Sequence, residues 1–251
     1  MRGITETVKH LIIINAIFFV GTLTLGEGKL FYELFALYFP ESDAFKPWQI
    51  ITHMFMHGGF MHILFNMFAL WMFGSAVEQR LGVKKFLFLY FSAGLGAALF
   101  QVGFYYFNYI PVFDSLINSG LSSSQIYEML ASNQVTGNIT AEQFENLKAI
   151  FPVFNATMVG ASGCIMGILV AFGMLNPNAE LMLLFLPIPI KAKYFIPGII
   201  ALDIISALTG QSFFSPSNTA FMAHVGGAFI GFIIMLFWRK DNDMFNKYRI
   251  D

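Results

Sequence analysis

Long apolar segments separated by short polar ones set the pattern of this chain. A helix needs about 20 mostly apolar residues to cross the hydrocarbon core of a bilayer. Six segments meet or approach that length; the apolar run of the second, residues 62–76, and the fifth segment are the shortest. They occupy residues 10–25, 62–79, 86–109, 158–175, 194–208 and 220–238. The pattern predicts an all-α polytopic membrane protein, in which residues 1–251 form a single bundle of six transmembrane helices.

Three longer connections join these helices. Residues 26–60 are rich in aromatic side chains and proline, which favours an element at the membrane interface over a solvated linker. Residues 111–155 are the most polar part of the chain, and we interpret them as an outer loop insertion. Amphipathic patterns within this insertion predict short helices at 122–130 and 141–150. Residues 211–219 form a short connection without charge.

The composition agrees with a membrane location. Hydrophobic residues make up 57% of the chain and charged residues 12%, whereas about a quarter of a soluble domain is charged. The net charge of −1 gives no sign of a nucleic-acid partner. Cys164 is the single cysteine, which excludes an intrachain disulfide. His53, His57 and His62 lack the His-Glu-x-x-His spacing of a zinc protease, so we expect no metal and no cofactor.

The basic residues predict an orientation. With the N-terminus inside, only Lys29, Lys46 and Lys148 of the 14 Lys and Arg residues fall outside, which leaves eleven inside. This positive-inside bias predicts that both termini are cytoplasmic. The same topology places the start of the fourth helix, with Ser162, and the start of the sixth, with His224, at comparable depth on the outer side. The compact six-helix pattern and the lack of a targeting presequence favour an integral protein of a bacterial inner membrane.

Ser162 and His224 are unusual in segments expected to lie in lipid, because polar and ionisable groups at membrane depth are rare and commonly functional. The Ser162 hydroxyl can be a nucleophile, and His224 can be its base, since imidazole exchanges protons near neutral pH. A helix start also supplies unpaired N–H groups for an anion beside Ser162. The sequence places no carboxylate where it could orient His224, so a Ser–His dyad is expected rather than a triad. Asp203 in the fifth helix has no partner that the sequence names, and packing and function stay open as its role.

The second predicted helix offers hydrogen-bond donors. His62 and Asn66 are four residues apart, so they share one face of a helix. Both are neutral donors that can point at an oxyanion together with the backbone N–H of Ser162. These four side chains and one backbone group are the candidate catalytic machinery.

Each of these features also has a structural interpretation. Serine in a membrane helix commonly bonds its own backbone, and a lone histidine can be a satisfied interior residue. Gly163 with Gly167, and Gly227 with Gly231, are small residues four apart that let helix backbones approach in lipid. A small-solute transporter would also bury polar groups, but the chain has no inverted repeat or Gly/Pro-broken helix pair. The joint occurrence of these features favours a catalytic role for Ser162 and His224.

The motifs together resemble those of the rhomboid intramembrane serine proteases. The matching stretches are residues 62–66, 78–82 and 160–163, and Ala223-His224 followed by Gly227 and Gly231. The resemblance implies a Ser162–His224 dyad, with His62, Asn66 and the Ser162 backbone forming the oxyanion hole. It further implies that the protein, surrounded by membrane lipid, cleaves transmembrane protein substrates near the outer edge of the bilayer.

The chain also departs from the family pattern. Trp48-Gln49 stands where many members carry Trp-Arg. By family analogy, residues 211–219 would form a flexible cap with Phe213 and Phe214 as plugs over the site. The alternative function is a non-catalytic rhomboid-like protein that binds membrane clients, which is disfavoured because inactive relatives typically lose the Ser or the His. The sequence predicts no oligomeric state, because lipid-facing and dimer surfaces have the same composition.

Overall fold

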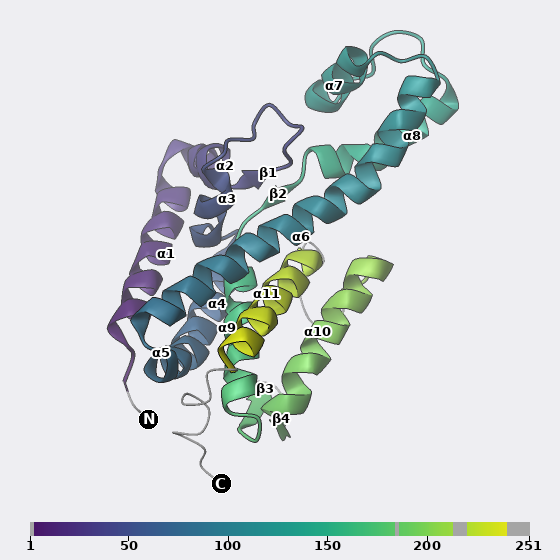
Figure 1. The fold of residues 1–251 in the computed structure, drawn as a ribbon. Coiled ribbons are helices and arrows are strands. Elements are labelled where there is room, and N and C mark those ends of the chain that lie inside the picture. Colours follow the sequence, from purple (N-terminus) through teal and green to yellow (C-terminus); the bar gives the residue numbers. More distant parts are fainter. Residues whose placement is uncertain (1–2, 184–185, 213–219, 240–251) are drawn as a thin grey trace.

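The computed structural model describes residues 3–183, 186–212 and 220–239 as a mostly helical membrane bundle (Figure 1). The helices of the bundle are α1 (Glu6–Thr24), α4 (Phe60–Ala69), α5 (Ser75–Leu81), α6 (Val83–Asn118), α9 (Ser162–Leu175), α10 (Ala192–Thr209) and α11 (Phe221–Arg239). A π-helical turn at Leu70–Gly74 joins α4 and α5 into one continuous span. The side predicted to face outward, called the outer side below, carries α2 (Lys29–Phe35), α3 (Gln49–Thr52), α7 (Ser123–Ser132) and α8 (Ala141–Phe154).

Two small sheets interrupt the all-helical pattern that the sequence predicts. β1 (Leu37–Tyr38) pairs antiparallel with β2 (Thr157–Met158), and β3 (Glu180–Leu183) pairs antiparallel with β4 (Leu186–Lys191). Short 3₁₀ turns follow α1 and α3, at Gly26–Gly28 and His53–Phe55. The β3–β4 pair lies at the end of the bundle opposite α7 and α8, whereas β1 contacts α3 on the other side of the molecule (Figure 1).

Within the described residues, five helical stretches are long and apolar enough to cross a membrane. They are Glu6–Thr24, Phe60–Leu81, Val83–Asn118, Ala192–Thr209 and Phe221–Arg239. α9 is equally apolar but has 14 residues, about 21 Å at 1.5 Å per residue, against a hydrocarbon core of about 30 Å. All of residues 163–171 in α9 are buried, and α6 and α11 pack closely against this helix. The fourth predicted helix is thus short and enclosed by protein.

Two helices differ from their predicted bounds. The third extends from 109 to Asn118, so Pro111 lies inside α6 and the outer insertion begins as helix. The fourth begins at Ser162 instead of 158, because Thr157–Met158 is held as a strand against β1. Gly160 then adopts a φ of +127°, which glycine tolerates and which turns the chain into α9. The other predicted helices agree to within four residues at each end.

α9 and α11 cross at their glycines, as the spacing predicts. A Cβ atom added at Gly227 would lie 2.0 Å from the backbone oxygen of Gly163, and one at Gly231 would lie 2.6 Å from the Cα of Gly167. These are contacts between two backbones, and neither backbone has a side chain that could move aside. The glycines therefore set the separation of the two helices.

Replacing Gly227 with valine is expected to force α9 and α11 apart and to lower stability by about 3 kcal/mol, the upper end of overpacking effects. The measurement is thermal unfolding of the purified protein in detergent, with Gly103→Ala as the control. Nothing lies within 4 Å of a Cβ at Gly103, so that variant should unfold close to the wild-type temperature. Equal unfolding temperatures for Gly227→Val and wild type would contradict the close crossing.

An outer subdomain projects beyond the bundle and is formed by the outer end of α6 with α7 and α8 (Figure 1). Each of the two short helices begins with a capping box, from Ser122 with Gln125 and from Thr140 with Gln143, which confirms the helices predicted there. The subdomain has its own hydrophobic core. Its buried side chains are Phe39, Tyr109, Leu116, Ile126, Met129, Leu130, Leu147, Ile150 and Phe154.

Glu41 connects the first outer loop to this subdomain. Its carboxylate accepts hydrogen bonds from the hydroxyl of Tyr106 at 2.8 Å and from that of Tyr127 at 2.9 Å. Since Tyr106 belongs to α6 and Tyr127 to α7, the loop, the long helix and the subdomain are fastened at one point. The outer side of the protein is therefore built by segments that are far apart in sequence.

Several basic residues gather at one end of the bundle. The start of α1, α5, the β3–β4 pair and the end of α11 lie at one end of the molecule, opposite the outer subdomain (Figure 1). Basic residues at that end include Lys9, Arg80, Lys84, Lys191 and Arg239. α9 and α11 run in the same direction, and Ser162 and His224 lie near their starts, so both candidate residues fall toward the other end.

Candidate active site

Ser162 is the first residue of α9, at the point where an extended segment becomes helix. The first N–H groups of a helix have no partner in the preceding turn, so the backbone around Ser162 presents donors. The N–H of Gly160 donates to the carbonyl of His53 at 2.9 Å, which fixes the strand that leads into the helix. The fold therefore holds the Ser162 hydroxyl at a fixed position below the outer ends of the long helices.

His224 lies in the first turn of α11 and faces Ser162. Its Nε2 atom is 2.9 Å from the Ser162 Oγ atom. The Ala223 N–H donates to Gln101 Oε1 at 3.1 Å, so a side chain of α6 holds the start of α11 in place. The structure brings together the two residues that the sequence singles out, at hydrogen-bond distance.

The Asp203 carboxylate lies next to His224, so that Ser162, His224 and Asp203 follow one another in a line. Its Oδ2 atom lies 3.0 Å from Nδ1 of His224, on the opposite side of the ring from Ser162. The side chains are 8% exposed for Asp203 and 14% for His224. The expectation that no carboxylate could orient His224 is wrong. The sequence does contain a signal for this contact: Asp203 is the one carboxylate in a mostly apolar helix, and a carboxylate at membrane depth is usually paired with another group.

His62 and Asn66 lie on one face of α4, as their spacing predicts. The Gly58 N–H donates to His62 Nδ1 at 3.3 Å, which leaves the proton of a neutral ring on Nε2. A Cβ atom at Gly160 would lie 2.9 Å from His62 Nε2 and 3.6 Å from Ser162 Oγ, so this nitrogen and the hydroxyl border the same small space. In the described part of the chain the buried Nδ2 of Asn66 has no hydrogen-bond partner. His62 Nε2 is thus available beside Ser162, and Asn66 Nδ2 is a second donor one turn further along α4.

Two further histidines precede α4, outside the membrane-spanning helices. Burial lowers the pKa of His53 to about 4 and that of His57 to about 3. Both are therefore neutral at neutral pH. The His53 ring bonds the Gln49 carbonyl through Nδ1 at 2.9 Å, and the His57 ring packs edge-on against that of His62, with centroids 5.0 Å apart. The His57 ring thus packs against His62, and neither His53 nor His57 adds positive charge near the site.

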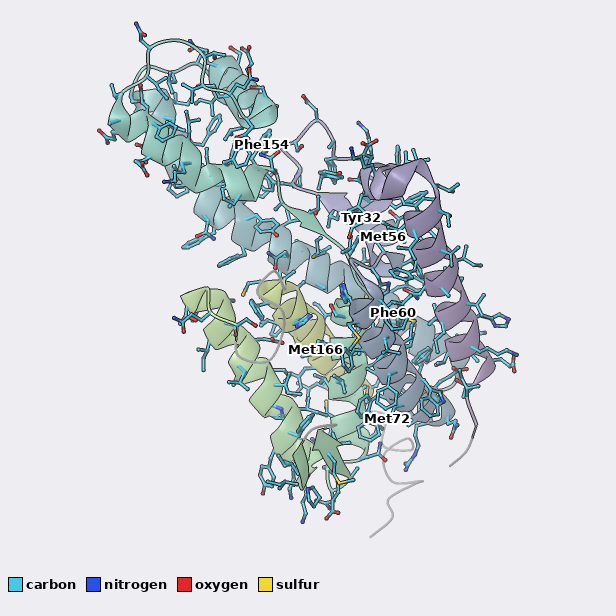
Figure 2. All side chains as sticks on the ribbon, turned by 180° about the vertical axis from the view of Figure 1, so that it is seen from behind. Tyr32, Met56, Phe60, Met72, Phe154 and Met166 are labelled. Atoms are coloured by element: carbon cyan, nitrogen blue, oxygen red, sulfur yellow. The ribbon has the colours of Figure 1, made fainter. Side chains whose placement is uncertain are left out.

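The site lies between the outer end of the bundle and its middle. Figure 2 shows Met56 and Phe60 at the outer level, Met72 toward the inner end and Met166 between them. Ser162 precedes Met166 by one helical turn on α9 and so lies outward of it. Any group that reacts with the hydroxyl must therefore enter the bundle part of the way.

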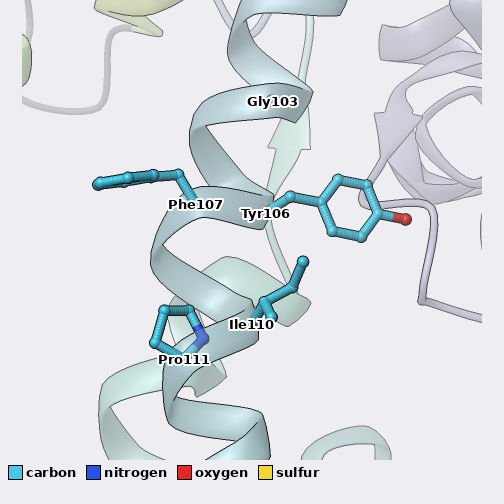
Figure 3. Close-up of a pocket in the computed structure, with 5 residues that line it drawn as sticks. All are labelled: Gly103, Tyr106, Phe107, Ile110 and Pro111. Atoms are coloured by element: carbon cyan, nitrogen blue, oxygen red, sulfur yellow. The ribbon is translucent and has the colours of Figure 1, made fainter.

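An apolar depression on the outer part of α6 is unsuited to chemistry. Its lining residues are Gly103, Tyr106, Phe107, Ile110 and Pro111 (Figure 3). The hydroxyl of Tyr106 is engaged by Glu41, and the other side chains carry no polar group. It has no set of convergent polar atoms, which an active site needs. The predicted plugs Phe213 and Phe214 lie outside the described residues.

Comparison with known families matches residues 44–241 to the rhomboid domain. The chain is 28% identical over 211 residues to the presenilin-associated rhomboid-like protein A, mitochondrial, of Danio rerio, covering 81% of this chain and 42% of that protein. It is 27% identical over 134 residues to rhomboid-like protease 1 of Toxoplasma gondii, covering 51% of this chain and 46% of that protein. A stretch of 43 residues is 51% identical to the rhomboid protease GlpG of Salmonella newport, covering 17% of this chain and 16% of that protein.

The chain thus spans less than half the length of these curated relatives. The family match nevertheless covers most of this chain and runs from before α4 to the end of α11. It includes the helices that carry Ser162, His224, His62 and Asn66. With this domain and a helical membrane bundle, the chain belongs to the rhomboid family.

Proposed function

We propose that this protein is an intramembrane serine endopeptidase that cleaves transmembrane substrates near the outer face of the membrane. The observation that carries the proposal is the 2.9 Å contact between Ser162 Oγ and His224 Nε2 inside an apolar bundle. A nucleophile and a base at that distance are what acyl transfer requires. Placing both groups in a membrane bundle favours a substrate that is itself in the membrane.

The proposed reaction begins when Ser162 Oγ attacks the carbonyl carbon of the scissile peptide. His224 Nε2 takes the hydroxyl proton as the new C–O bond forms. The protonated ring then gives that proton to the leaving amine, and the peptide C–N bond breaks to leave an acyl-enzyme. Water attacks this ester with His224 again as base, which releases the second product and restores Ser162.

The negative oxygen of each tetrahedral intermediate needs donors in place before the reaction. The proposed donors are His62 Nε2, Asn66 Nδ2 and the Ser162 N–H. The proton placement on His62 and the unpartnered amide of Asn66 support these roles. A buried amide without a partner is costly for a fold, and this cost is offset when the amide meets an oxyanion.

We propose that the basic end of the bundle and both termini of the chain face the cytoplasm. The basic residues at the inner end of the helices support this orientation. A bacterial inner membrane remains the proposed location, although one of the relatives carries the word mitochondrial in its name. In this orientation the site opens toward the outer face.

The test is cleavage of a single-span substrate by the full chain, purified in detergent and then reconstituted in liposomes. We expect product fragments whose new ends lie near the outer membrane boundary, and covalent labelling of Ser162 by a fluorophosphonate probe. Labelling should block cleavage, because both reactions use the same hydroxyl. Binding of substrate without either cleavage or labelling would instead identify a non-catalytic protein that holds membrane clients.

A further inference from the structure

We propose that Asp203 is a positioning residue that turns the Ser162–His224 pair into a Ser–His–Asp chain. This inference rests on the proposed function and adds one residue to it. Asp203 would act through His224, since its carboxylate contacts the imidazole and lies across the ring from Ser162. Its role is to fix the tautomer of the ring and to stabilise the positive charge that the ring acquires.

The geometry assigns one proton to each of the two hydrogen bonds that join Ser162, His224 and Asp203. An ionised carboxylate can only accept, so a 3.0 Å contact with Nδ1 requires that Nδ1 carry the proton. The neutral ring then has an unprotonated Nε2, which accepts the hydrogen bond of the Ser162 hydroxyl at 2.9 Å. The opposite tautomer would place N–H against the hydroxyl and leave no base. Asp203 thus selects the form of His224 that can react.

The charges balance during the proposed attack. When the Ser162 proton moves to Nε2, the ring becomes an imidazolium and faces the Asp203 carboxylate. The proton on Nδ1 stays on Nδ1, so the carboxylate compensates the charge without taking up a proton. An imidazolium in an apolar bundle is otherwise costly, because a buried charge without a partner loses its hydration. The pairing lowers that cost at the moment of reaction.

The location of Asp203 argues against a packing role. A carboxylate in a membrane helix is expensive, and an apolar residue would fill the same position of α10 without that cost. Across residues 3–183, 186–212 and 220–239, the hydrogen bond recorded for the Asp203 side chain is the one to His224. Over the same residues, no aromatic ring stacks on the His224 imidazole to fix its orientation. Asp203 is therefore the group in contact with Nδ1 that can hold the ring's orientation.

The experiment compares Asp203→Asn, Asp203→Ala and Asp203→Glu in the full chain, with Ser206→Ala as the matched control. Ser206 is also a buried polar residue of α10, one turn further along. We expect kcat to fall about 10²- to 10⁴-fold for Asn and Ala, with little change in KM and an equal fall in the fluorophosphonate labelling rate. Glutamate should restore part of the rate, because it returns a carboxylate. Ser206→Ala should keep wild-type kcat.

A second readout reports on the hydrogen bond itself. In protein labelled with ¹⁵N-histidine, the wild type should show a low-field proton coupled to Nδ1 of His224, and His224→Ala identifies that signal. The signal should survive Ser206→Ala and disappear in Asp203→Ala. Because it is measured in the wild type, a variant that fails to fold does not remove the test.

The outcomes separate this inference from the proposed function. If kcat of Asp203→Asn and Asp203→Ala stayed within about twofold of wild type while Ser162→Ala was inactive, the positioning role would be wrong and the protease assignment would stand. The absence of the Nδ1 signal in the wild type would also overturn the positioning role. If Ser162→Ala still cleaved substrate, the protease assignment itself would be wrong.

Discussion

Replacing His224 or Ser162 with alanine is expected to lower kcat by roughly 10⁴-fold or more, the usual effect of losing a base or nucleophile from such a unit. Without His224 the hydroxyl keeps its proton, and without Ser162 there is no atom to form the acyl-enzyme. The two groups are 2.9 Å apart and act in one step. The double variant should therefore be about as slow as either single variant, since removing the second member of a unit costs little more.

The measurement is the rate of fragment formation from a single-span substrate in detergent, together with probe labelling. His10→Ala and Ser132→Ala are matched controls, because His10 is exposed on α1 and Ser132 is exposed on α7. Both controls should cleave at the wild-type rate. A His224→Ala variant with more than a tenth of wild-type activity, or two single effects that multiply in the double variant, would show that the two residues do not act together.

Replacing Asn66 with alanine is expected to lower kcat about 100- to 1,000-fold, and replacing His62 should do the same. Each change removes one donor from the position where the oxyanion forms, and the effect falls on kcat more than on KM because the donor acts in the transition state. Asn66→Asp should be at least as slow as Asn66→Ala. It keeps the shape of the side chain but places a carboxylate where negative charge develops.

Asn108→Ala is the matched control for Asn66, since Asn108 is an exposed amide on α6 that donates to the Phe104 carbonyl. Steady-state kcat and KM should be wild type for this variant. Thermal unfolding checks the fold, and Asn66→Ala should unfold no earlier than wild type, because the lost amide has an unpartnered nitrogen. Unchanged kcat in both Asn66→Ala and His62→Ala would place the oxyanion elsewhere.

Much of the proposed site could be predicted because its signals are local or periodic. The four-residue spacing of His62 and Asn66 places them on one helix face, and the glycine pairs predict which helices touch. The role of Asp203 could not be predicted in the same way. Whether it faces His224 depends on how α10 is rotated against α11, and lipid-facing and buried sides of α10 have the same apolar composition. Only the packed structure fixes that rotation.

The fold shows the same division between local signals and tertiary contacts. The sequence predicts that a loop begins at Pro111, but α6 continues through it, because the outer subdomain packs against the extended end of the helix. The apolar pattern predicts a start of α9 at 158, four residues before the observed start at Ser162, because residues 158–161 are as apolar as the helix that follows. The strand pairing with Leu37–Tyr38 decides their conformation, and that partner is more than a hundred residues away.

The pairing of β1 with β2 has a consequence for what the first outer loop does in a bilayer. Hydrocarbon cannot bond to backbone N–H and C=O groups, so unwound chain at membrane depth persists only where protein supplies the partners. Leu37–Tyr38 and the His53 carbonyl supply them for the segment 157–160. The loop thus takes the place of water along this segment. Without the loop, the segment 157–160 would be driven to form helix, and Ser162 would no longer be the first residue of a helix.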